Sequence, residues 1–205
     1  SLRFIYDHYA YGLGAIGDAM DDKRLLGFEE YRDFLLDCGV IDAQFVEREA
    51  NWSFVSARMR VIKESTERGR AKLLQLGFED FLESLVRIAS VKAMPFLEDA
   101  ETAGCVDAGE YLVKLHLEGG VPLKSFLSTH AVPLGAPLPQ PIHLAVNALV
   151  TFLLRTIMVT SGGKSVDAPE VKISAADCKA FIRSGGVRSR ANAAEGEAEA
   201  SASDE

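Results

Sequence analysis

Hydrophobic residues recur at helical spacing along most of the chain. Leu2, Ile5 and Tyr9 repeat at intervals of three and four residues, which is the stripe of an amphipathic helix. Similar stripes follow, separated by glycines, prolines or charged runs such as Lys63–Lys72, which we interpret as an exposed loop. The pattern therefore predicts an all-α protein. The predicted helices lie within residues 2–9, 28–38, 43–57, 78–91, 108–117, 123–130, 142–159 and 174–183.

One short stretch occurs twice. Residues 26–31 read Leu-Gly-Phe-Glu-Glu-Tyr, and residues 76–81 read Leu-Gly-Phe-Glu-Asp-Phe. Each copy opens a predicted helix, so the first 94 residues read as two helix-loop-helix units. That order is an EF-hand pair in outline, in which each twelve-residue loop carries an aliphatic residue at its eighth position. The alignment places Leu26 and Leu76 at that position and predicts that they pair.

The calcium ligands of an EF-hand are missing from both loops. In the first loop, residues 19–30, positions one, three and five hold Ala19, Asp21 and Lys23. In the second loop, residues 69–80, the same positions hold glycine, alanine and leucine. Calcium takes about six to eight oxygen ligands, many of them from carboxylates. We interpret both units as helical scaffolds that hold no metal.

A third loop, Asp99–Glu110, matches the calcium-binding pattern better. It has glycine at position six, although Ala103 brings no oxygen to position five. The alternative is a polar turn in which Asp107 caps a helix over residues 108–117. The sequence leaves both interpretations open. The candidate calcium ligands, at positions one, three, nine and twelve, are Asp99, Glu101, Asp107 and Glu110.

The last third of the chain begins with a proline-rich connector. Residues 132–141 contain four prolines and are predicted to be extended. The following residues 142–159 are the most apolar stretch, but they include His143, Asn147 and Arg155. A membrane span needs about 20 predominantly apolar residues, so this stretch predicts a buried helix and no membrane contact.

The final predicted helix opens with Ser174 and Asp177, which have the spacing of a capping box. From Ser184 onward glycine, serine, alanine and glutamate dominate, and we expect disorder. The predicted organisation is an EF-hand-like pair without calcium ligands (1–94), a helical extension (95–131), the proline-rich connector (132–141), a smaller C-terminal helix-loop-helix (142–184) and an acidic disordered tail (185–205).

Charge and cysteine content restrict the function classes. The net charge is -8, and residues 195–205 carry five of the negative charges without a base among them, so the rest of the chain, at about -3, is nearly balanced. Nucleic-acid-binding proteins usually carry an excess of lysine and arginine, and this chain has none. The three cysteines are far apart and form no CxxC pair, which predicts free thiols in a reducing compartment. They are Cys38, Cys105 and Cys178.

No stretch of the sequence matches a catalytic motif. The four histidines share no metal-ligand spacing. Residues 162–165, Gly-Gly-Lys-Ser, resemble the end of a phosphate-binding loop, but the first glycine of that motif is missing and a helix precedes them instead of a strand. We therefore expect a protein that is not an enzyme and has no cofactor, with calcium as the one metal to test.

Several stretches of the first 94 residues resemble a degenerate EF-hand-like module of ciliary and flagellar proteins and of the tubulin-polymerisation-promoting protein family. Residues 37–42, Asp-Cys-Gly-Val-Ile-Asp, are similar to the exit of that family's first hand. Residues 77–89 contain the pattern F-x-x-F-L-x-x-L-x-R-x-A of a helix in the axonemal proteins. Ile5, Tyr6 and Tyr9 resemble that group's opening helix.

The resemblance implies a structural role in microtubule assemblies. It implies a scaffold protein, or a domain of one, within a large ciliary or flagellar complex at the axoneme of the cytoskeleton. Its expected partners are other axonemal proteins, with tubulin as a further candidate. The alternative function is a calcium-responsive binding protein that uses the loop 99–110.

Overall fold

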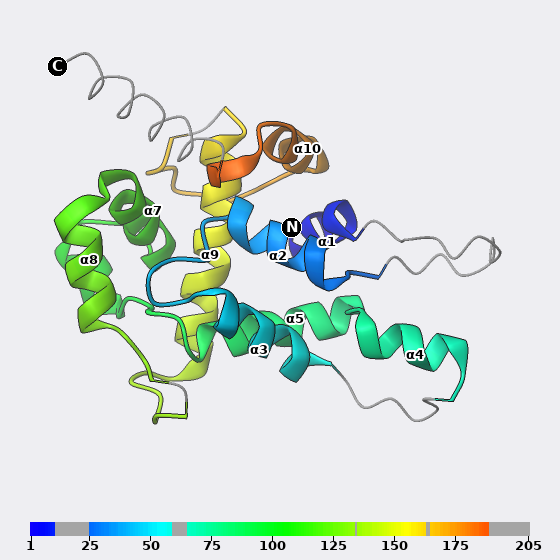
Figure 1. Cartoon of the computed structure of the whole chain (residues 1–205). Coiled ribbons are helices and arrows are strands. Elements are labelled where there is room, and N and C mark those ends of the chain that lie inside the picture. The colour runs from blue at the N-terminus through cyan, green and yellow to red at the C-terminus, as the bar shows by residue number, and fades with distance from the viewer. Residues whose placement is uncertain (11–24, 59–64, 134, 163–164, 189–205) are drawn as a thin grey trace, which may run out of the picture.

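The structure is a computed structural model that describes residues 1–10, 25–58, 65–133, 135–162 and 165–188. Across these ranges the regular secondary structure is helical, with one isolated β-bridge, so the predicted all-α class is confirmed. The helices are α1 (Leu2–Tyr9), α2 (Phe28–Asp37), α3 (Glu47–Ala57), α4 (Glu67–Leu74), α5 (Phe78–Ala89), α6 (Leu97–Thr102), α7 (Ala108–Glu118), α8 (Gly120–Thr129), α9 (Ile142–Thr160) and α10 (Ala175–Arg183) (Figure 1).

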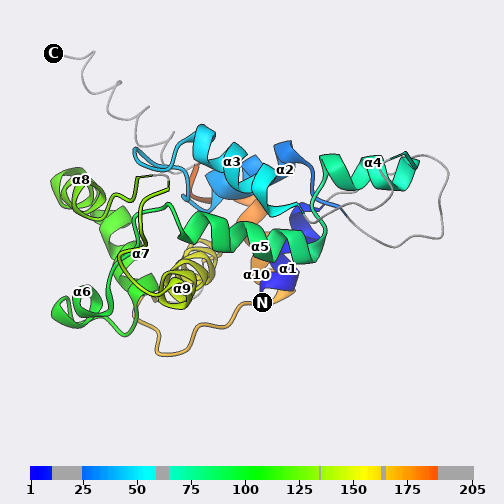
Figure 2. The ribbon, with the colours of Figure 1, turned by 90° about the horizontal axis from the view of Figure 1, so that it is seen from below.

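Helix α9 is the central element of the fold. It packs against α5, α7 and α10, and Figure 2 shows it nearly end-on with α5 and α7 beside it. Leu149, Phe152, Leu153 and Ile157 are buried along it. By length and composition α9 could span a membrane, since its mean hydropathy is 1.8, but half of it is buried inside the protein. Its contacts with three other helices account for its apolar sequence.

The proline-rich connector does not divide the hydrophobic core. We call residues 1–94, which contain both repeats, the repeat half. Its buried side chains and those of α9 and α10 belong to one continuous cluster among the described residues. Helix α10 contacts α1, so both ends of the described chain meet in the fold. The chain therefore returns after residues 132–141 to cover the N-terminal helices, and the expected smaller C-terminal part shares their core.

Leu26 and Leu76 pair as the repeat predicts. They form an isolated antiparallel bridge in which each N–H donates to the other's carbonyl, at 2.9 and 2.8 Å. The Tyr6 hydroxyl also donates to the Leu76 carbonyl at 3.1 Å. Phe34 and Phe81, one from each repeat helix, have ring centroids 5.5 Å apart in an edge-to-face arrangement. The bridge and these aromatic contacts join the two helix starts, and both leucines are fully buried.

The prediction of a loop at Lys63–Lys72 is wrong for the residues that the structure describes. Helix α4 runs from Glu67 to Leu74, and the Thr66 hydroxyl caps it by accepting a bond from the Gly69 N–H at 3.0 Å. The charged residues of this stretch indicated solvent exposure, which a helix at one end of the molecule also satisfies (Figure 1). Charge alone did not distinguish a loop from an exposed helix.

Helix α3 begins later than the sequence predicted. Asp42 bonds to the Gln44 and Phe45 N–H groups at 2.8 Å, as a cap would, but the helix itself starts at Glu47. Val46 is extended and precedes the first helical residue. The Asp42 carboxylate therefore closes a turn before the helix.

Residues 185–188, the start of the predicted disordered tail, pack against the rest of the protein. Gly186 is buried, and Arg188 pairs with Asp33 at 3.0 Å and with Asp37 at 2.9 Å, so this segment packs on α2. At Gly186 a Cβ atom would lie 2.5 Å from the Asp37 carbonyl oxygen, which explains why glycine is needed there. The remainder of the predicted tail, 189–205, and the first predicted loop, 11–24, lie outside the described residues.

Candidate functional site

The four candidate calcium ligands do not gather around one point. In the part of the chain that the structure describes, no three histidine, cysteine, aspartate or glutamate side chains come together as a metal ion would require. Asp99 lies within α6, Asp107 precedes α7 and Glu110 lies in the first turn of α7, whereas Glu101 is exposed. The predicted twelve-residue loop is therefore largely helical, with a short turn between α6 and α7.

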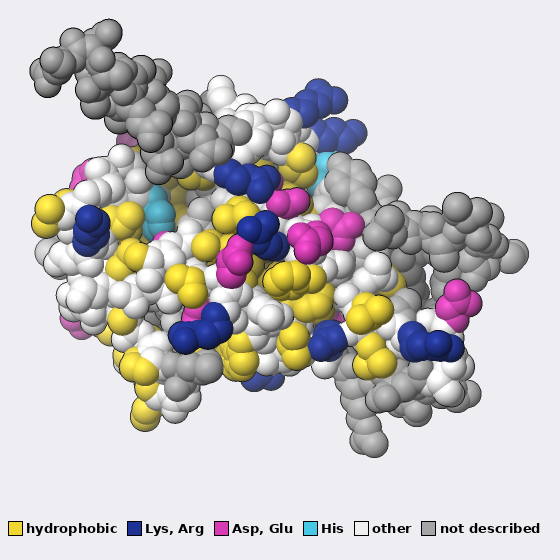
Figure 3. All heavy atoms as spheres, in the orientation of Figure 1, with side chains coloured by type: hydrophobic (Ala, Val, Ile, Leu, Met, Phe, Trp, Pro, Cys, Tyr) yellow, Lys and Arg dark blue, Asp and Glu magenta, His cyan; other side chains and the backbone are white. Residues whose placement is uncertain are grey.

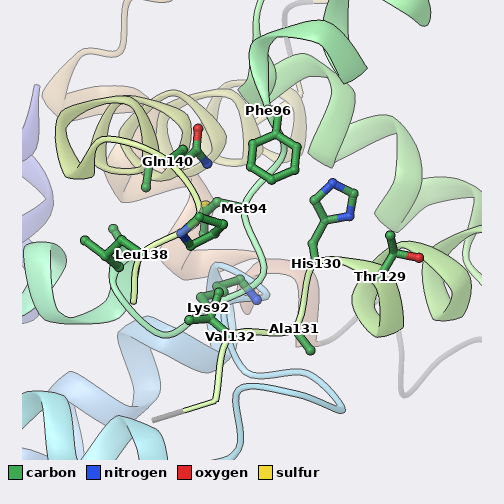
Figure 4. Close-up of a pocket in the computed structure, with 12 residues that line it drawn as sticks. Lys92, Met94, Phe96, Thr129, His130, Ala131, Val132, Leu138 and Gln140 are labelled. Atoms are coloured by element: carbon green, nitrogen blue, oxygen red, sulfur yellow. The ribbon is translucent and has the colours of Figure 1, made fainter. Parts of the chain in front are cut away.

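Asp99 contacts a histidine beside a small pocket. Its Oδ2 atom lies 3.0 Å from Nε2 of His130, and it also accepts a hydrogen bond from the Phe96 N–H at 2.7 Å. The His130 ring stacks on Phe126, with the ring centroids 4.4 Å apart. Figure 4 shows His130 beside Phe96, with Leu138 and Gln140 of the connector across the pocket.

The pocket beside His130 is too small to be a substrate site. Its volume is about 70 Å³, whereas small-molecule sites in proteins usually exceed about 300 Å³. Gln140 donates to the Pro95 carbonyl at 3.2 Å and so ties the proline-rich connector to the segment before α6. Asp99 is thus engaged by His130, a residue of this pocket wall.

Asp107 has two partners that explain its position. Its Oδ1 atom accepts a bond from the Glu110 N–H at 2.9 Å and caps α7, as the structural alternative proposed. Arg155 donates to Asp107 from Nη2 at 2.6 Å and from Nε, and its Nη1 bonds to the carbonyls of Val166 and Ala168. Burial alone would raise the pKa of Asp107, but these hydrogen bonds, chiefly from Arg155, hold its pKa below its usual value.

Both oxygens of the Glu110 carboxylate also have partners within the chain. The side chain is buried, Oε2 accepts a bond from the Val106 N–H at 2.8 Å, and Lys114 pairs with Oε1 at 2.6 Å. A calcium ion at this carboxylate would have to replace both contacts. The geometry therefore favours the structural turn over the calcium site.

Titration of calcium into the purified chain is expected to release no heat at millimolar concentration. Asp99, Asp107 and Glu110 would first have to leave His130, Arg155 and Lys114, and hydrogen bonds to charged groups are worth about 1.5–3 kcal/mol each. Isothermal titration calorimetry measures this directly. A saturable heat that disappears in Glu110→Gln would instead establish the calcium site.

The acids at the twelfth positions of the two repeats act as helix caps. Glu30 accepts a hydrogen bond from the Gly27 N–H at 2.6 Å, and Asp80 accepts one from the Gly77 N–H at 3.0 Å. Both are third in their helices, where a carboxylate reaches back to the residue before the first turn. Asp177 makes the same contact with the Ser174 N–H at 2.8 Å, which confirms the predicted capping box.

A buried ion pair, which the sequence analysis did not identify, joins the turn after α5 to the turn before α3. Lys92 is 1% exposed, and its ammonium group pairs with Asp42 and donates to the Val40 carbonyl at 2.8 Å. Burial lowers the pKa of Lys92, and the Asp42 carboxylate opposes that shift. Although burial disfavours the Asp42 anion, the Lys92 charge holds the pKa of Asp42 below its usual value. The available signal was a single lysine in the apolar run 91–94.

Two of the three thiols are buried, and burial disfavours their nucleophilic thiolate form. Cys38 and Cys178 are free and buried, whereas Cys105 is half-buried. Burial raises the pKa of the Cys38 thiol well above its usual range and that of Cys178 to about 11. Since the thiolate is the nucleophilic form, these two side chains contribute to packing.

Comparison with known proteins gave no relatives: no family model, curated protein or solved structure matches the chain. The similarity to the degenerate EF-hand-like module therefore depends on the residues quoted for it.

Proposed function

We propose that this protein is a non-enzymatic scaffold that binds partner proteins through the helical surface of its two repeats. The observation that supports this most is the Leu26–Leu76 bridge, which joins both repeated helix starts into one unit. We further propose that this unit is EF-hand-like in its pairing. The acids at the twelfth positions, Glu30 and Asp80, accept hydrogen bonds from backbone N–H groups and so cap the helices that contain them.

The helices of residues 1–94 carry exposed apolar side chains that a partner can contact. Val55 on α3 is 49% exposed, Leu82 on α5 is 36% exposed, and Leu74 at the end of α4 is 70% exposed. Figure 3 shows hydrophobic, basic and acidic side chains interspersed over one face of the molecule. An interface between proteins need be no more apolar than the rest of the surface, so such a mixed face is compatible with partner binding.

The cellular setting of the proposal comes from the resemblance of residues 37–42 and 77–89 to axonemal proteins. On that basis the partners are axonemal proteins, with tubulin as a further candidate, in a ciliary or flagellar microtubule complex of the cytoskeleton. No nucleic acid or membrane takes part in this proposal. The calcium-responsive alternative is not proposed, because Asp107 and Glu110 are held by Arg155 and Lys114.

The purified chain is expected to sediment with isolated axonemes in a saturable way. A charge in an apolar contact surface is costly, so the double variant Val55→Glu/Leu82→Glu should reduce the bound fraction at least about tenfold. The measurement is the amount of chain in the pellet as a function of its concentration, with and without axonemes.

The matched control is Val121→Glu on α8, which changes an equally apolar side chain outside the repeats at a site that is 78% exposed. This variant should bind axonemes like the unmodified chain. If the unmodified chain stays in the supernatant at every concentration, the axonemal role is contradicted. If Val121→Glu reduces binding as much as the double variant does, the repeat half is not the binding surface.

A further inference from the structure

The last described residues, 185–188, form a short segment that lies against α2 (Figure 1). We call this segment the strap. It follows α10, which ends at Arg183, and it begins with two glycines whose φ angles are +71° and +60°. Both angles lie in the left-handed region, which glycine adopts without the steric cost that other residues have there. The chain can therefore turn sharply after α10 and return to α2.

Arg188 attaches the strap to two acids of α2. Its Nη1 atom lies 3.0 Å from Oδ1 of Asp33, and its Nη2 atom lies 2.9 Å from Oδ1 of Asp37. The Asp33 side chain is half exposed, whereas that of Asp37 is only 6% exposed. Ion pairs at the surface contribute little to stability, so the contact with the buried acid is the stronger attachment.

The buried Asp37 carboxylate depends on the strap for its cation. Its Oδ2 atom accepts a hydrogen bond from the Tyr9 hydroxyl at 3.0 Å, which the strap does not affect. Oδ1 is buried, makes no hydrogen bond to the described residues and has Arg188 as its ion-pair partner. Burial raises the pKa of Asp37, and the Tyr9 hydrogen bond and the Arg188 charge oppose that shift. Any segment that replaces the strap must therefore bring a cation to Oδ1, because an unpaired buried oxygen is costly.

The two residues before Arg188 fit the surface beside these acids. At Gly186 a Cβ atom would lie 2.5 Å from the Asp37 carbonyl oxygen, so the strap backbone approaches α2 closely there. Val187 forms part of the wall of a cavity of about 310 Å³ between α7, α9 and the turn after α2. It also lies over Gly39, where an added Cβ would be 3.8 Å from a Val187 methyl carbon. Glycine, valine and arginine thus meet a backbone, an apolar wall and a carboxylate in turn.

We propose that the C-terminal end of α2 and this cavity form a docking site for a partner segment with the order small residue, aliphatic residue, arginine, and that the strap occupies the site in the free protein. The arginine is selected because its planar guanidinium group reaches two acids at once. The strap is a tethered competitor, so its effective concentration is in the millimolar range. The site is separate from Val55 and Leu82 and does not depend on the axonemal role.

The probe is the end-blocked peptide Ser-Gly-Gly-Val-Arg-Ser, which has the sequence of residues 184–189. It is titrated into the complete, isotope-labelled chain, and amide chemical shifts report binding. In Gly186→Ala the new Cβ overlaps the Asp37 carbonyl, so the strap leaves and the site becomes free. The peptide should then give saturable shifts at Asp33, Asp37 and Gly39. It should bind the unmodified chain at least about tenfold more weakly, because the strap competes.

A second peptide and a second variant test what the site selects. A peptide with glutamine in place of arginine leaves Oδ1 of Asp37 unpaired, so it should bind Gly186→Ala at least about tenfold more weakly. Arg188→Gln removes the cation of the strap without adding a clash. This variant should also bind the arginine peptide more tightly than the unmodified chain does, and it keeps the test open if Gly186→Ala does not fold.

The matched control is Gly135→Ala. This glycine has a φ angle of +83°, and a Cβ there would meet nothing within 4 Å among the described residues, so the variant should bind the peptide like the unmodified chain. The proposal is overturned if neither Gly186→Ala nor Arg188→Gln shows saturable shifts at the end of α2 with millimolar peptide. It is also overturned if the arginine and glutamine peptides bind equally well.

Two further outcomes would reject the role of the strap. If the unmodified chain binds the peptide as tightly as Gly186→Ala does, the strap does not fill the site. If light scattering shows that the unmodified chain forms dimers that the peptide dissociates, the occupant is the strap of a second copy and a separate partner is rejected. Neither measurement involves axonemes, so a failure here is distinct from a failure of the scaffold proposal.

Discussion

Lys92→Met is expected to lower the free energy of unfolding by about 3–5 kcal/mol. The variant keeps a side chain of similar length but leaves the Asp42 carboxylate buried without its cation. Removing one partner of a buried pair is costly because the other charge stays out of water. Urea denaturation followed by circular dichroism gives the difference, provided that the dependence on urea concentration keeps its slope.

The loss in Lys92→Met should depend on pH in a defined direction. In the unmodified chain the pKa of Asp42 is lowered, so its contribution to stability is present above its unfolded pKa, near 3.9, and is lost as the pH falls. Without the ammonium group, burial raises that pKa. The free energy of unfolding of the variant then falls as the pH rises, because the buried Asp42 loses its proton. The difference from the unmodified chain should therefore be small near pH 4 and large near pH 7.

Two further variants test the cause of that loss. In Lys92→Met/Asp42→Asn the amide keeps the bonds from the Gln44 and Phe45 N–H groups but has no charge, so most of the stability should return. Lys172→Met changes an exposed lysine, 73% accessible, and should alter stability by no more than about 0.5 kcal/mol. A deficit in Lys92→Met that is independent of pH and is not recovered by the second substitution would contradict the buried-charge explanation.

Gly109→Ala is expected to lower the free energy of unfolding by about 1–3 kcal/mol. Gly109 lies where α7 crosses α9, and a Cβ atom there would be 2.5 Å from the Phe152 nitrogen and 2.5 Å from the Thr151 carbonyl carbon. Alanine favours a helix over glycine by at most about 1 kcal/mol, which does not offset contacts that force two helices apart. Thermal and urea unfolding measure the net effect.

The double variant Gly109→Ala/Thr151→Ala separates side-chain from backbone crowding. It removes the Thr151 hydroxyl, which would lie 2.6 Å from the new Cβ, but leaves the two backbone contacts. Little stability should therefore return. Two outcomes would contradict the close contact between the backbones of α7 and α9 at Gly109. One is that Gly109→Ala is as stable as the unmodified chain. The other is that adding Thr151→Ala restores the stability of that variant fully.

Much of the fold was predictable because its signals are local. The stripes of Ile5, Tyr9 and the later helices follow from helical periodicity, and the Ser174 cap follows from a three-residue spacing. The pairing of Leu26 with Leu76 was predictable for another reason, since a repeated segment occupies equivalent positions in two similar units. The error at the start of α3 concerns an element boundary, which depends on competing caps and turns. Helix α4 was missed as an element, because its charged residues indicated only solvent exposure.

The contacts that determine the candidate sites were not predictable from local spacing. Lys92 and Asp42 are fifty residues apart, and Asp107 and Arg155 are forty-eight apart, so their pairing depends on how the helices pack. The calcium pattern at 99–110 matched acids by position, yet α6 directs Asp99 toward His130. The cavity of about 310 Å³ that His116 lines needs α7, α9, the turn after α2 and Val187 together, and no motif in any one of them indicates it.

The Arg155 contacts also bear on how the protein loses its structure. One guanidinium group bonds to Asp107 before α7 and to two carbonyls in the segment that leads to α10, while its own backbone belongs to α9. If α7 detaches from α9, a permanently charged group in the interior loses its anion, and opening the 166–168 segment removes its other acceptors. Partial opening of either segment is therefore costly, and we expect these three parts of the chain to unfold as one cooperative unit.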